Sequence, residues 1–501
     1  VFMNSQVKQA QKDGASVNDI SAGLAISVVK NALYKVIRTA NPEELGRHIV
    51  VQGGTFLNDA VLRAFEAELG VEVVRPQIAG LMGAYGAALY AKLMVKRNNL
   101  KKSSVISKEE LDELTHTVQN VRCQGCTNHC LLTVNSFGNR RRLISGNRCE
   151  RPVTGKAPLS ADKYDLYAYK QELLEGYRKR KEGKRGTMGL PLALGIYELL
   201  PFYVTLFQSL GFDTVVSPFS SRELYIHGQA AIPSDTVCFP AKLMHGHVQY
   251  LVEQKVDRIF IPCSSYNINE EKGNNHFNCP VVAYYGEVIK GNQDLEGIPL
   301  TLGYLSLEHK GHLAKRISEL FGTGRRESLK AVENAFAELA EYRRKITEKG
   351  KEIIELSREE KRPIVVLAGR PYHTDPEINH GIDRMIVQLG ASVITEDSIA
   401  PLTDKGSFGV LNQWTYHARM YDAARFVREQ KDMNLVQLVS FGCGLDAVTT
   451  DEVRDILREK DKIYTQIKID EITNLGAVKI RMRSLFAALE MEEENGEKSI
   501  H

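Results

Sequence analysis

The sequence predicts an α/β protein with two Rossmann-like parallel-sheet domains that are joined by a long helix. Three observations predict this fold. From residue 190 onward, short apolar runs alternate with amphipathic stretches, which is typical of βαβ units. The charged stretch 324–360 has the periodicity of one long helix. After Pro363 a second alternating series begins, and series of this kind favour parallel sheets.

The apolar pattern predicts the elements of both domains. In the first domain we expect helices at 202–211 and 240–254, and strands at 192–197, 213–218, 257–262 and 279–286. In the second domain we expect helices at 381–390, 414–430 and 451–459, and strands at 364–370, 392–395, 435–442 and 464–470.

The first 97 residues also alternate, with helices expected at 22–37, 58–70 and 81–96, and strands at 48–52 and 71–76. The chain starts without an initiator methionine and enters helix-like sequence at once, so we expect a fragment or processed product of a longer protein. Polar residues at 98–121 favour a linker with a short helix. The expected domains are 1–97, 98–155, 186–323 and 362–490, with the connecting helix at 324–361.

Composition excludes several functional classes. The formal net charge of +3 and the lack of a long basic tract argue against a nucleic-acid partner. A membrane-spanning helix needs about 18 or more consecutive apolar residues, and the sequence has no such run and no signal peptide. We therefore expect a cytoplasmic protein with no membrane partner.

Four of the eight cysteines cluster in one module: Cys123, Cys126, Cys130 and Cys149. Their Cys-x2-Cys-x3-Cys spacing with a distant fourth thiol suits structural zinc and equally an iron–sulfur cluster, so the metal stays open. The intervening residues predict a β-hairpin that turns at Gly138-Asn139.

The other four cysteines are isolated in sequence, and each taken alone is more typical of a packed core thiol. Cys238 lies just before a predicted helix that begins near Pro240, where a thiolate is favoured. Cys263 and Cys443 follow predicted strands at their carboxyl ends, where ligands of open α/β sheets collect. We therefore expect Cys238, Cys263 and Cys443 to meet in one cleft and to hold an iron–sulfur cluster. Cys279, which precedes its predicted strand, is expected at the opposite edge as a reserve ligand.

The stretch RPYHTDPEINHG at 370–381 gathers Arg370, His373 and His380 before a predicted helix. It suits an anion site, although a strand-to-helix turn held by its prolines explains the same pattern.

Several motifs carry a resemblance to a known family. IPSDTVCFPAKLMHGHV, IFIPC, HFNCPVV, RPYHTDPEINHGI and SFGCGLDAVTTDEV within 185–490 resemble the acyl-CoA dehydratase activase-related proteins. These are fused relatives of 2-hydroxyacyl-CoA dehydratase and benzoyl-CoA reductase subunits and of double-cubane-cluster reductases. Residues 20–95 look like the tail of the activase ATPase, which belongs to the actin-like class, so the resemblance implies a partial actin-like ATPase lobe.

The resemblance implies the iron–sulfur component of an ATP-dependent low-potential electron-transfer system. Its cofactor would be a 4Fe–4S or double-cubane cluster on Cys238, Cys263 and Cys443. VVQGGTFLN resembles a nucleotide-binding motif, which implies that Gly53 and Gly54 lie beside adenosine. The phosphate loops of the ATPase are not in this sequence, so ATP is expected only in the full-length protein.

The resemblance also implies an activase ATPase partner, a homodimer, and acyl-CoA as the reducible substrate. No catalytic acid or base is evident. Two alternatives stay open at this point: a non-catalytic, zinc-stabilised scaffold that binds a partner, and a reductase of a small non-CoA molecule.

Overall fold

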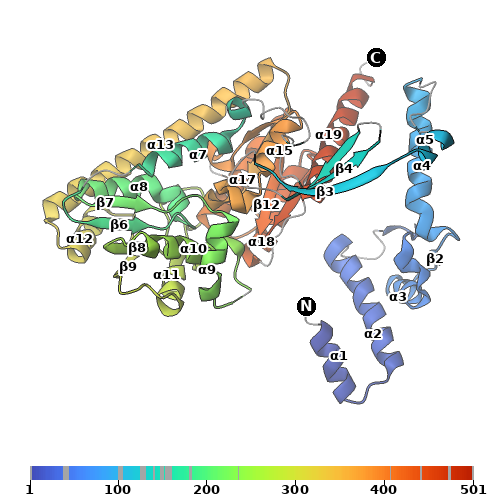
Figure 1. The fold of residues 1–501 in the computed structure, drawn as a ribbon, viewed down its shortest axis with the longest axis horizontal. Helices are drawn as coiled ribbons and strands as arrows, with labels where there is room; N and C mark the ends of the chain where they lie inside the picture. Colours follow the sequence, from blue (N-terminus) through green and yellow to red (C-terminus); the bar gives the residue numbers. More distant parts are fainter. Residues whose placement is uncertain are drawn as a thin grey trace. The chain divides into compact units, whose positions relative to one another are not determined.

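The computed structural model describes most of the chain in two compact units, 1–114 and 115–501, which are treated separately below (Figure 1). The described residues are 3–37, 45–99, 105, 107–124, 131–138, 141–146, 152, 161–179, 183–234, 236–404, 406, 408–440, 443–471 and 475–498.

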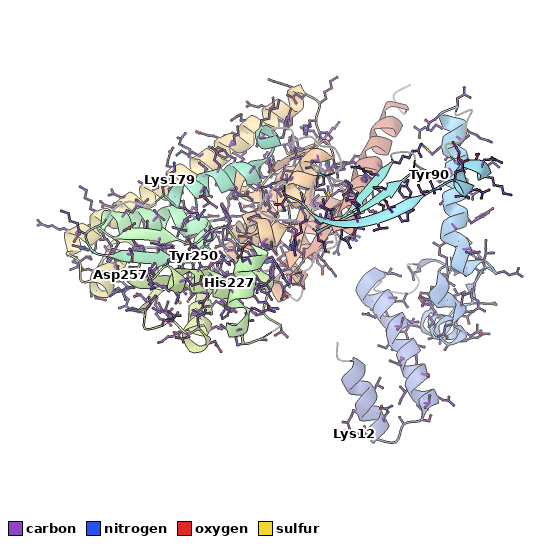
Figure 2. All side chains as sticks on the ribbon, in the orientation of Figure 1. Lys12, Tyr90, Lys179, His227, Tyr250 and Asp257 are labelled. Atoms are coloured by element: carbon purple, nitrogen blue, oxygen red, sulfur yellow. The ribbon has the colours of Figure 1, made fainter. Side chains whose placement is uncertain are left out.

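The first unit is mostly helical around a short two-stranded parallel sheet. Its elements are α1 (Met3–Lys12), α2 (Val17–Lys30), a π-helical turn (Asn31–Ile37), β1 (Ile49–Val50), α3 (Asp59–Leu69), β2 (Val73–Val74), α4 (Met82–Arg97) and α5 (Lys108–Asp112), with 3₁₀ turns at Gly54–Leu57 and Ala79–Leu81. α2 and α3 pack around a small core that includes Val29, Leu33 and Phe65. The side chains of α4 stay largely exposed, including Tyr90 (Figure 2).

Residues 115–146 contribute a three-stranded antiparallel sheet made of β3 (His116–Arg122), β4 (Leu131–Phe137) and β5 (Arg142–Ser145). β4 pairs with β5 in antiparallel register, Thr133 opposite Ser145, as the predicted hairpin requires. β3 lies where a linker was expected, and all seven of its residues pair with β4.

The first α/β lobe contains the parallel sheet β6 (Thr187–Leu190), β7 (Asp213–Val216), β8 (Arg258–Cys263) and β9 (Leu300–Tyr304). The strands lie in the order β7-β6-β8-β9. The helices of the lobe are α8 (Ile196–Ser209), α9 (Arg222–Gly228), a 3₁₀ turn (Gln229–Ala231), α10 (Phe239–Glu253), α11 (Pro280–Asn292) and α12 (Lys310–Phe321).

The second α/β lobe repeats this order with β10 (Ile364–Ala368), β11 (Ser392–Ile394), β12 (Met433–Ser440) and β13 (Thr465–Ile469), arranged β11-β10-β12-β13 and all parallel. Its helices are α14 (Pro376–Asn379), α15 (Ile382–Gln388), α16 (Glu396–Ile399), α17 (Thr415–Arg428), α18 (Gly444–Arg458) and α19 (Leu475–Lys498), with 3₁₀ turns at Pro371–Thr374 and Ala400–Leu402.

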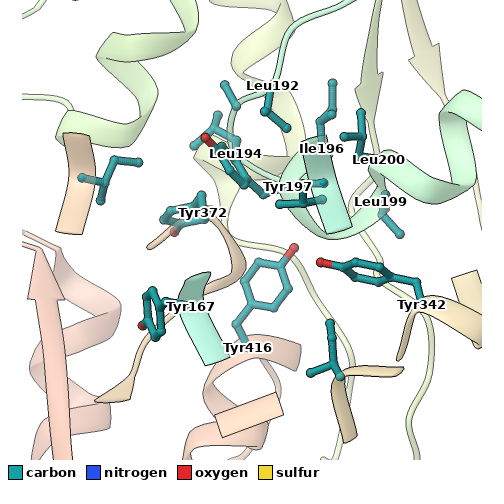
Figure 3. Packing of buried hydrophobic residues seen from close by; sticks show 14 of the residues in the cluster. Tyr167, Leu192, Leu194, Ile196, Tyr197, Leu199, Leu200, Tyr342, Tyr372 and Tyr416 are labelled. Carbon is teal, nitrogen blue, oxygen red and sulfur yellow. The ribbon is translucent and has the colours of Figure 1, made fainter. Parts of the chain in front are cut away.

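Two helices join the lobes. α13 (Arg325–Glu359) is the long helix expected from the sequence, and it packs on α8 of the first lobe and α16 of the second. α7 (Leu166–Tyr177) follows a 3₁₀ turn (Ala161–Tyr164) and packs on α8, α13 and β11. Because the buried side chains of both lobes form one continuous hydrophobic cluster, the lobes fold as one body (Figure 3).

Two predicted strands of the first lobe are wrong. Residues 279–286 form the start of α11, because Cys279 caps the helix and Pro280 takes its first position; the strand of this unit is β9. Residues 192–197 lie between β6 and α8, so the strand occurs earlier and the helix begins at Ile196. Both stretches are apolar on all sides, and periodicity alone does not separate a buried helix from a buried strand.

Within the described residues, every helix is too short or too polar to cross a membrane.

Candidate functional site

Three cysteines occupy the same structural position at the starts of three helices. Cys238 is the N-cap of α10, Cys279 the N-cap of α11 and Cys443 the N-cap of α18. All three thiols are partly buried. The first turn of a helix carries unpaired N–H groups and the positive end of the helix dipole. The backbone N–H of Val282 uses this geometry and donates to the Cys279 Sγ at 3.4 Å. Each of these positions therefore favours a negative charge on sulfur.

One buried cation, Arg370, interacts with all three thiols. Its Nη1 lies 3.8 Å from the Cys443 Sγ. Arg370 also acts electrostatically on Cys238 and Cys279, and so does the Cys443 thiol. Cys238 and Cys279 belong to the first lobe and Cys443 to the second, so the group spans both lobes.

The strand order explains why Arg370 and Cys443 meet. The chain leaves β10 toward β11 on one side and returns to β12 on the other, so a crevice opens beyond the carboxyl ends of β10 and β12. Arg370 follows β10 by two residues and Cys443 follows β12 by three. The two side chains thus enter the crevice from neighbouring strands.

Asp446 fixes the Arg370 guanidinium. Its carboxylate accepts hydrogen bonds from Nη1, at 3.2 Å, and from Nη2, and it also accepts the backbone N–H of Ser440 at 2.9 Å. Both members of this ion pair are buried. The Arg370 Nε is buried without a hydrogen-bond partner, as are Nε2 of His373 and both ring nitrogens of His417, which lies beside Asp446. Several buried nitrogen atoms at the site therefore have no hydrogen-bond partner within the protein.

Burial favours the protonated form of the Cys238 and Cys279 thiols. It raises the pKa of Cys238 to about 11, against the opposing effects of the Ala241 backbone N–H and Arg370. Burial likewise raises the pKa of Cys279, against the effect of the Val282 N–H. A metal that binds these thiols must displace their protons.

Cys263 lies elsewhere. It is the last residue of β8 and is 3% exposed. Its Sγ faces α11, where a Cβ added at Gly286 would stand 3.1 Å from it. Burial raises the pKa of this thiol to about 11, and the charge that acts on it is that of Glu287. The structure thus brings Cys238, Cys279 and Cys443 together, whereas Cys263 occupies the packing layer between β8 and α11.

The remaining predicted site residues are less informative. Cys123 follows β3, while Cys126, Cys130 and Cys149 lie outside the described residues. Gly53 has φ 101°, which a side chain rarely tolerates, and it begins the 3₁₀ turn that Gly54 enters. A Cβ at either glycine would meet nothing within 4 Å, so the backbone is open to an approaching group.

Within the described part of the chain, no three Cys, His, Asp or Glu side chains stand close enough to hold a single metal ion. The thiolate ligands of a cubane cluster bind different iron atoms. Their sulfur atoms are therefore farther apart than the ligands of a single metal ion. Three helix N-termini and a buried arginine also suit the negative charge of such a cluster. The cysteine donors and the positive surroundings at Arg370 would therefore suit the chemistry of an iron–sulfur cluster.

Sequence comparisons identify the relatives of this chain. Residues 187–399 match a family described as CoA enzyme activase uncharacterised domain, and residues 1–91 match the BadF/BadG/BcrA/BcrD ATPase family. The 2-hydroxyisocaproyl-CoA dehydratase activator of Clostridioides difficile is 37% identical over 91 residues, which are 18% of this chain and 33% of that protein. These matches support a resemblance to the acyl-CoA dehydratase activase-related proteins.

A second curated relative is the (R)-2-hydroxyglutaryl-CoA dehydratase activating ATPase of Acidaminococcus fermentans. It is 38% identical over 91 residues, which are 18% of this chain and 34% of the relative. The chain thus spans about a third of the length of the curated relatives it matches. Both matches are 91 residues long, as is the ATPase-family segment 1–91. The activase-domain match covers Cys238, Cys263 and Cys279 and ends before Cys443.

Proposed function

We propose that this protein is the iron–sulfur component of an ATP-dependent low-potential electron-transfer system of the 2-hydroxyacyl-CoA dehydratase or double-cubane reductase type. The observation that carries the proposal is that three helix-capping thiols from two lobes all interact with the buried Arg370. We assign the cluster to Cys238, Cys279 and Cys443, and Cys263 becomes the reserve ligand.

Three groups of residues would hold the cluster at this site. The thiols bind the cluster, and the helix N-termini with Arg370 offset its negative charge. Asp446 holds the guanidinium in place. When bound, the cluster supplies one-electron chemistry. Because three residues would hold a 4Fe–4S cluster, its fourth iron would have no protein ligand and could bind a substrate.

The partners belong to the same proposal. An ATPase of the activase type delivers the electron, since residues 1–91 match that ATPase family. The acceptor is an acyl-CoA or a small reducible molecule. We further propose a homodimer, ATP bound near Gly53 and Gly54 in the longer protein, and zinc or a second cluster on Cys123, Cys126, Cys130 and Cys149.

Anaerobic purification followed by iron, sulfide and zinc analysis tests the proposal. We expect a brown protein that contains iron and acid-labile sulfide. Cys238→Ser, Cys279→Ser and Cys443→Ser should each lose most of the cluster absorbance and iron. Cys263→Ser is the matched control, and it should keep both.

Two outcomes contradict parts of this proposal. A colourless protein that contains zinc alone would support the non-catalytic scaffold instead. Iron loss in Cys263→Ser, together with retention in Cys279→Ser, would return the ligand set to the one that sequence position alone suggests.

A further inference from the structure

A cavity of about 320 Å³ lies in the second unit outside the cysteine site, and its volume falls in the size range of small-molecule sites. Its wall comes from both lobes and from the two helices that join them. The lining residues from the first lobe lie on α8 and at 270–272, and those from the second lie on α16, on α17 and in the turns at Pro371–Thr374 and Ala400–Leu402.

One part of the wall is apolar. Leu174 of α7 and Ile346 of α13 are almost fully buried, and Pro371 and Pro401 face the same space. The rings of Tyr197 and Tyr342 add aromatic surface from the buried cluster shown in Figure 3. Such a wall binds the hydrocarbon part of a ligand and excludes water from it.

Two arginines and two glutamates in the wall neutralise one another. Glu198 accepts hydrogen bonds from Arg343, at 2.7 Å, and from Arg419. Glu270 binds the same arginines, at 3.1 Å and 2.5 Å. Although burial opposes it, Arg419 and Arg343 lower the pKa of Glu198 to about 2, so this carboxylate is ionised. This set contributes no net charge to the cavity.

Lys170 in the wall is similarly paired, whereas the ion pair of Lys272 is longer. Lys170 lies 2.7 Å from Asp397. For Lys272 the nearest carboxylate oxygen is Asp422 Oδ2, outside the lining and 3.8 Å away, beyond hydrogen-bond distance. Asp422 also pairs with Arg425, and burial raises its pKa to about 6. The Lys272 ammonium instead donates to the backbone carbonyl of Thr403, which carries no charge.

The lining therefore has four cations, Lys170, Lys272, Arg343 and Arg419, and three carboxylates, Glu198, Glu270 and Asp397, which leaves one positive charge. Glu396, behind the lining, accepts the Gly369 N–H, and burial raises its pKa to about 7. A single excess positive charge beside an apolar wall matches one negative charge on an apolar body. A doubly charged phosphate would overcompensate it.

We propose that this cavity binds a small organic monocarboxylate, with the carboxylate at Lys272 and the apolar body against α7 and α13. The contact would be a charge-assisted hydrogen bond in a partly buried site. The inference does not depend on the cluster, because none of the cysteines lines the cavity.

Isothermal titration of the full chain with benzoate and its uncharged analogue benzamide tests the proposal. We expect benzoate to bind at least about tenfold more tightly than benzamide, since a charged hydrogen bond is stronger than a neutral one. Lys272→Met should abolish this preference, and Lys272→Arg should keep most of it. Lys290→Met is the matched control, because Lys290 is an exposed lysine at the end of α11, away from the cavity.

A second variant tests the location independently of charge. Thr347 lies on the α13 side of the cavity and is half-buried, so Thr347→Trp should fill the space and remove benzoate binding. The proposal is overturned if benzoate does not bind the wild-type chain. It is also overturned if benzamide binds equally well, or if folded Lys272→Met and Thr347→Trp variants both bind benzoate as the wild type does.

Discussion

Each α/β lobe has a cysteine at or just beyond the end of a central strand, yet the two cysteines have opposite surroundings. Cys263 of the first lobe points into the layer between β8 and α11 and is packed against Gly286. Cys443 of the second lobe leaves β12, caps α18 and contacts the buried Arg370. The strand orders of the lobes are the same, so topology does not cause the difference. What distinguishes Cys443 from the packed Cys263 is that Cys443 caps a helix and lies beside a charged partner.

The largest effect should come from the second lobe. Arg370→Met leaves Asp446 as an unpaired buried carboxylate, and breaking a buried ion pair in this way costs about 3–5 kcal/mol. The sole tryptophan, Trp414, precedes α17 in this lobe, so urea unfolding followed by its fluorescence reports the change. The double variant Arg370→Met/Asp446→Asn should recover part of the loss. An unchanged unfolding midpoint in Arg370→Met would show that the pair is not formed.

The packed role of the first-lobe cysteine predicts a smaller effect. Gly286→Ala would place a Cβ 2.8 Å from Leu302 Cδ2 and 3.1 Å from Cys263 Sγ, and overpacking of this kind costs about 1–3 kcal/mol. Adding Cys263→Ala should relieve part of the cost.

Gly291→Ala in the same helix is the control, because nothing lies within 4 Å of its added Cβ. Thermal unfolding followed by circular dichroism measures all three variants. Equal stability of Gly286→Ala and Gly291→Ala would contradict the packed position of Cys263.

The smallest expected effect on stability concerns a buried histidine in each lobe. In the first lobe, both ring nitrogens of His247 are hydrogen-bonded, to Ser217 at 2.8 Å and Ser220 at 2.9 Å, whereas those of His417 in the second lobe have no hydrogen-bond partner. Burial, with a contribution from Arg178, lowers the pKa of His247 to about 3. The unfolded state therefore binds a proton that the folded state does not, between about pH 6.5 and about pH 3. Stability should fall as pH falls through this window.

His247→Gln should cost about 1–2 kcal/mol at pH 7 through lost hydrogen bonding, and it should flatten the loss of stability between pH 6.5 and 5. Urea midpoints measured at several pH values test this. His227→Gln, which removes a surface imidazole on α9, controls for general effects of the substitution (Figure 2). The same pH slope in wild type and His247→Gln would contradict the assignment.

Much of the fold could be predicted because its signals are local. The long helix, the central strands of the second lobe and the hairpin of β4 and β5 all follow from apolar periodicity and turn residues. Residues 279–286 could not be assigned in this way, since they are apolar throughout. The informative signal was Pro280 directly after Cys279, which is typical of the first position of a helix.

The wrong strand assignment of 279–286 also led to a wrong expected position for Cys279. Once 279–286 was expected to be a strand, Cys279 had to lie at the far edge of the sheet, although as a helix cap it joins Cys238 and Cys443. The side on which Cys263 points could not be predicted either. Successive side chains of a strand alternate between faces, and the position of α11 decides which face is covered.

The division of the three thiols between the lobes has a mechanical consequence. Cys238 and Cys279 start helices of the first lobe, and Cys443 starts a helix of the second. A cluster held by all three would cross-link two halves of the chain that are separated by about 160 residues of sequence, so its binding energy would add to the folding energy. Oxygen damage to the cluster would then weaken the attachment of α18 to the first lobe, and protease sensitivity of α18 would report the loss of the redox centre.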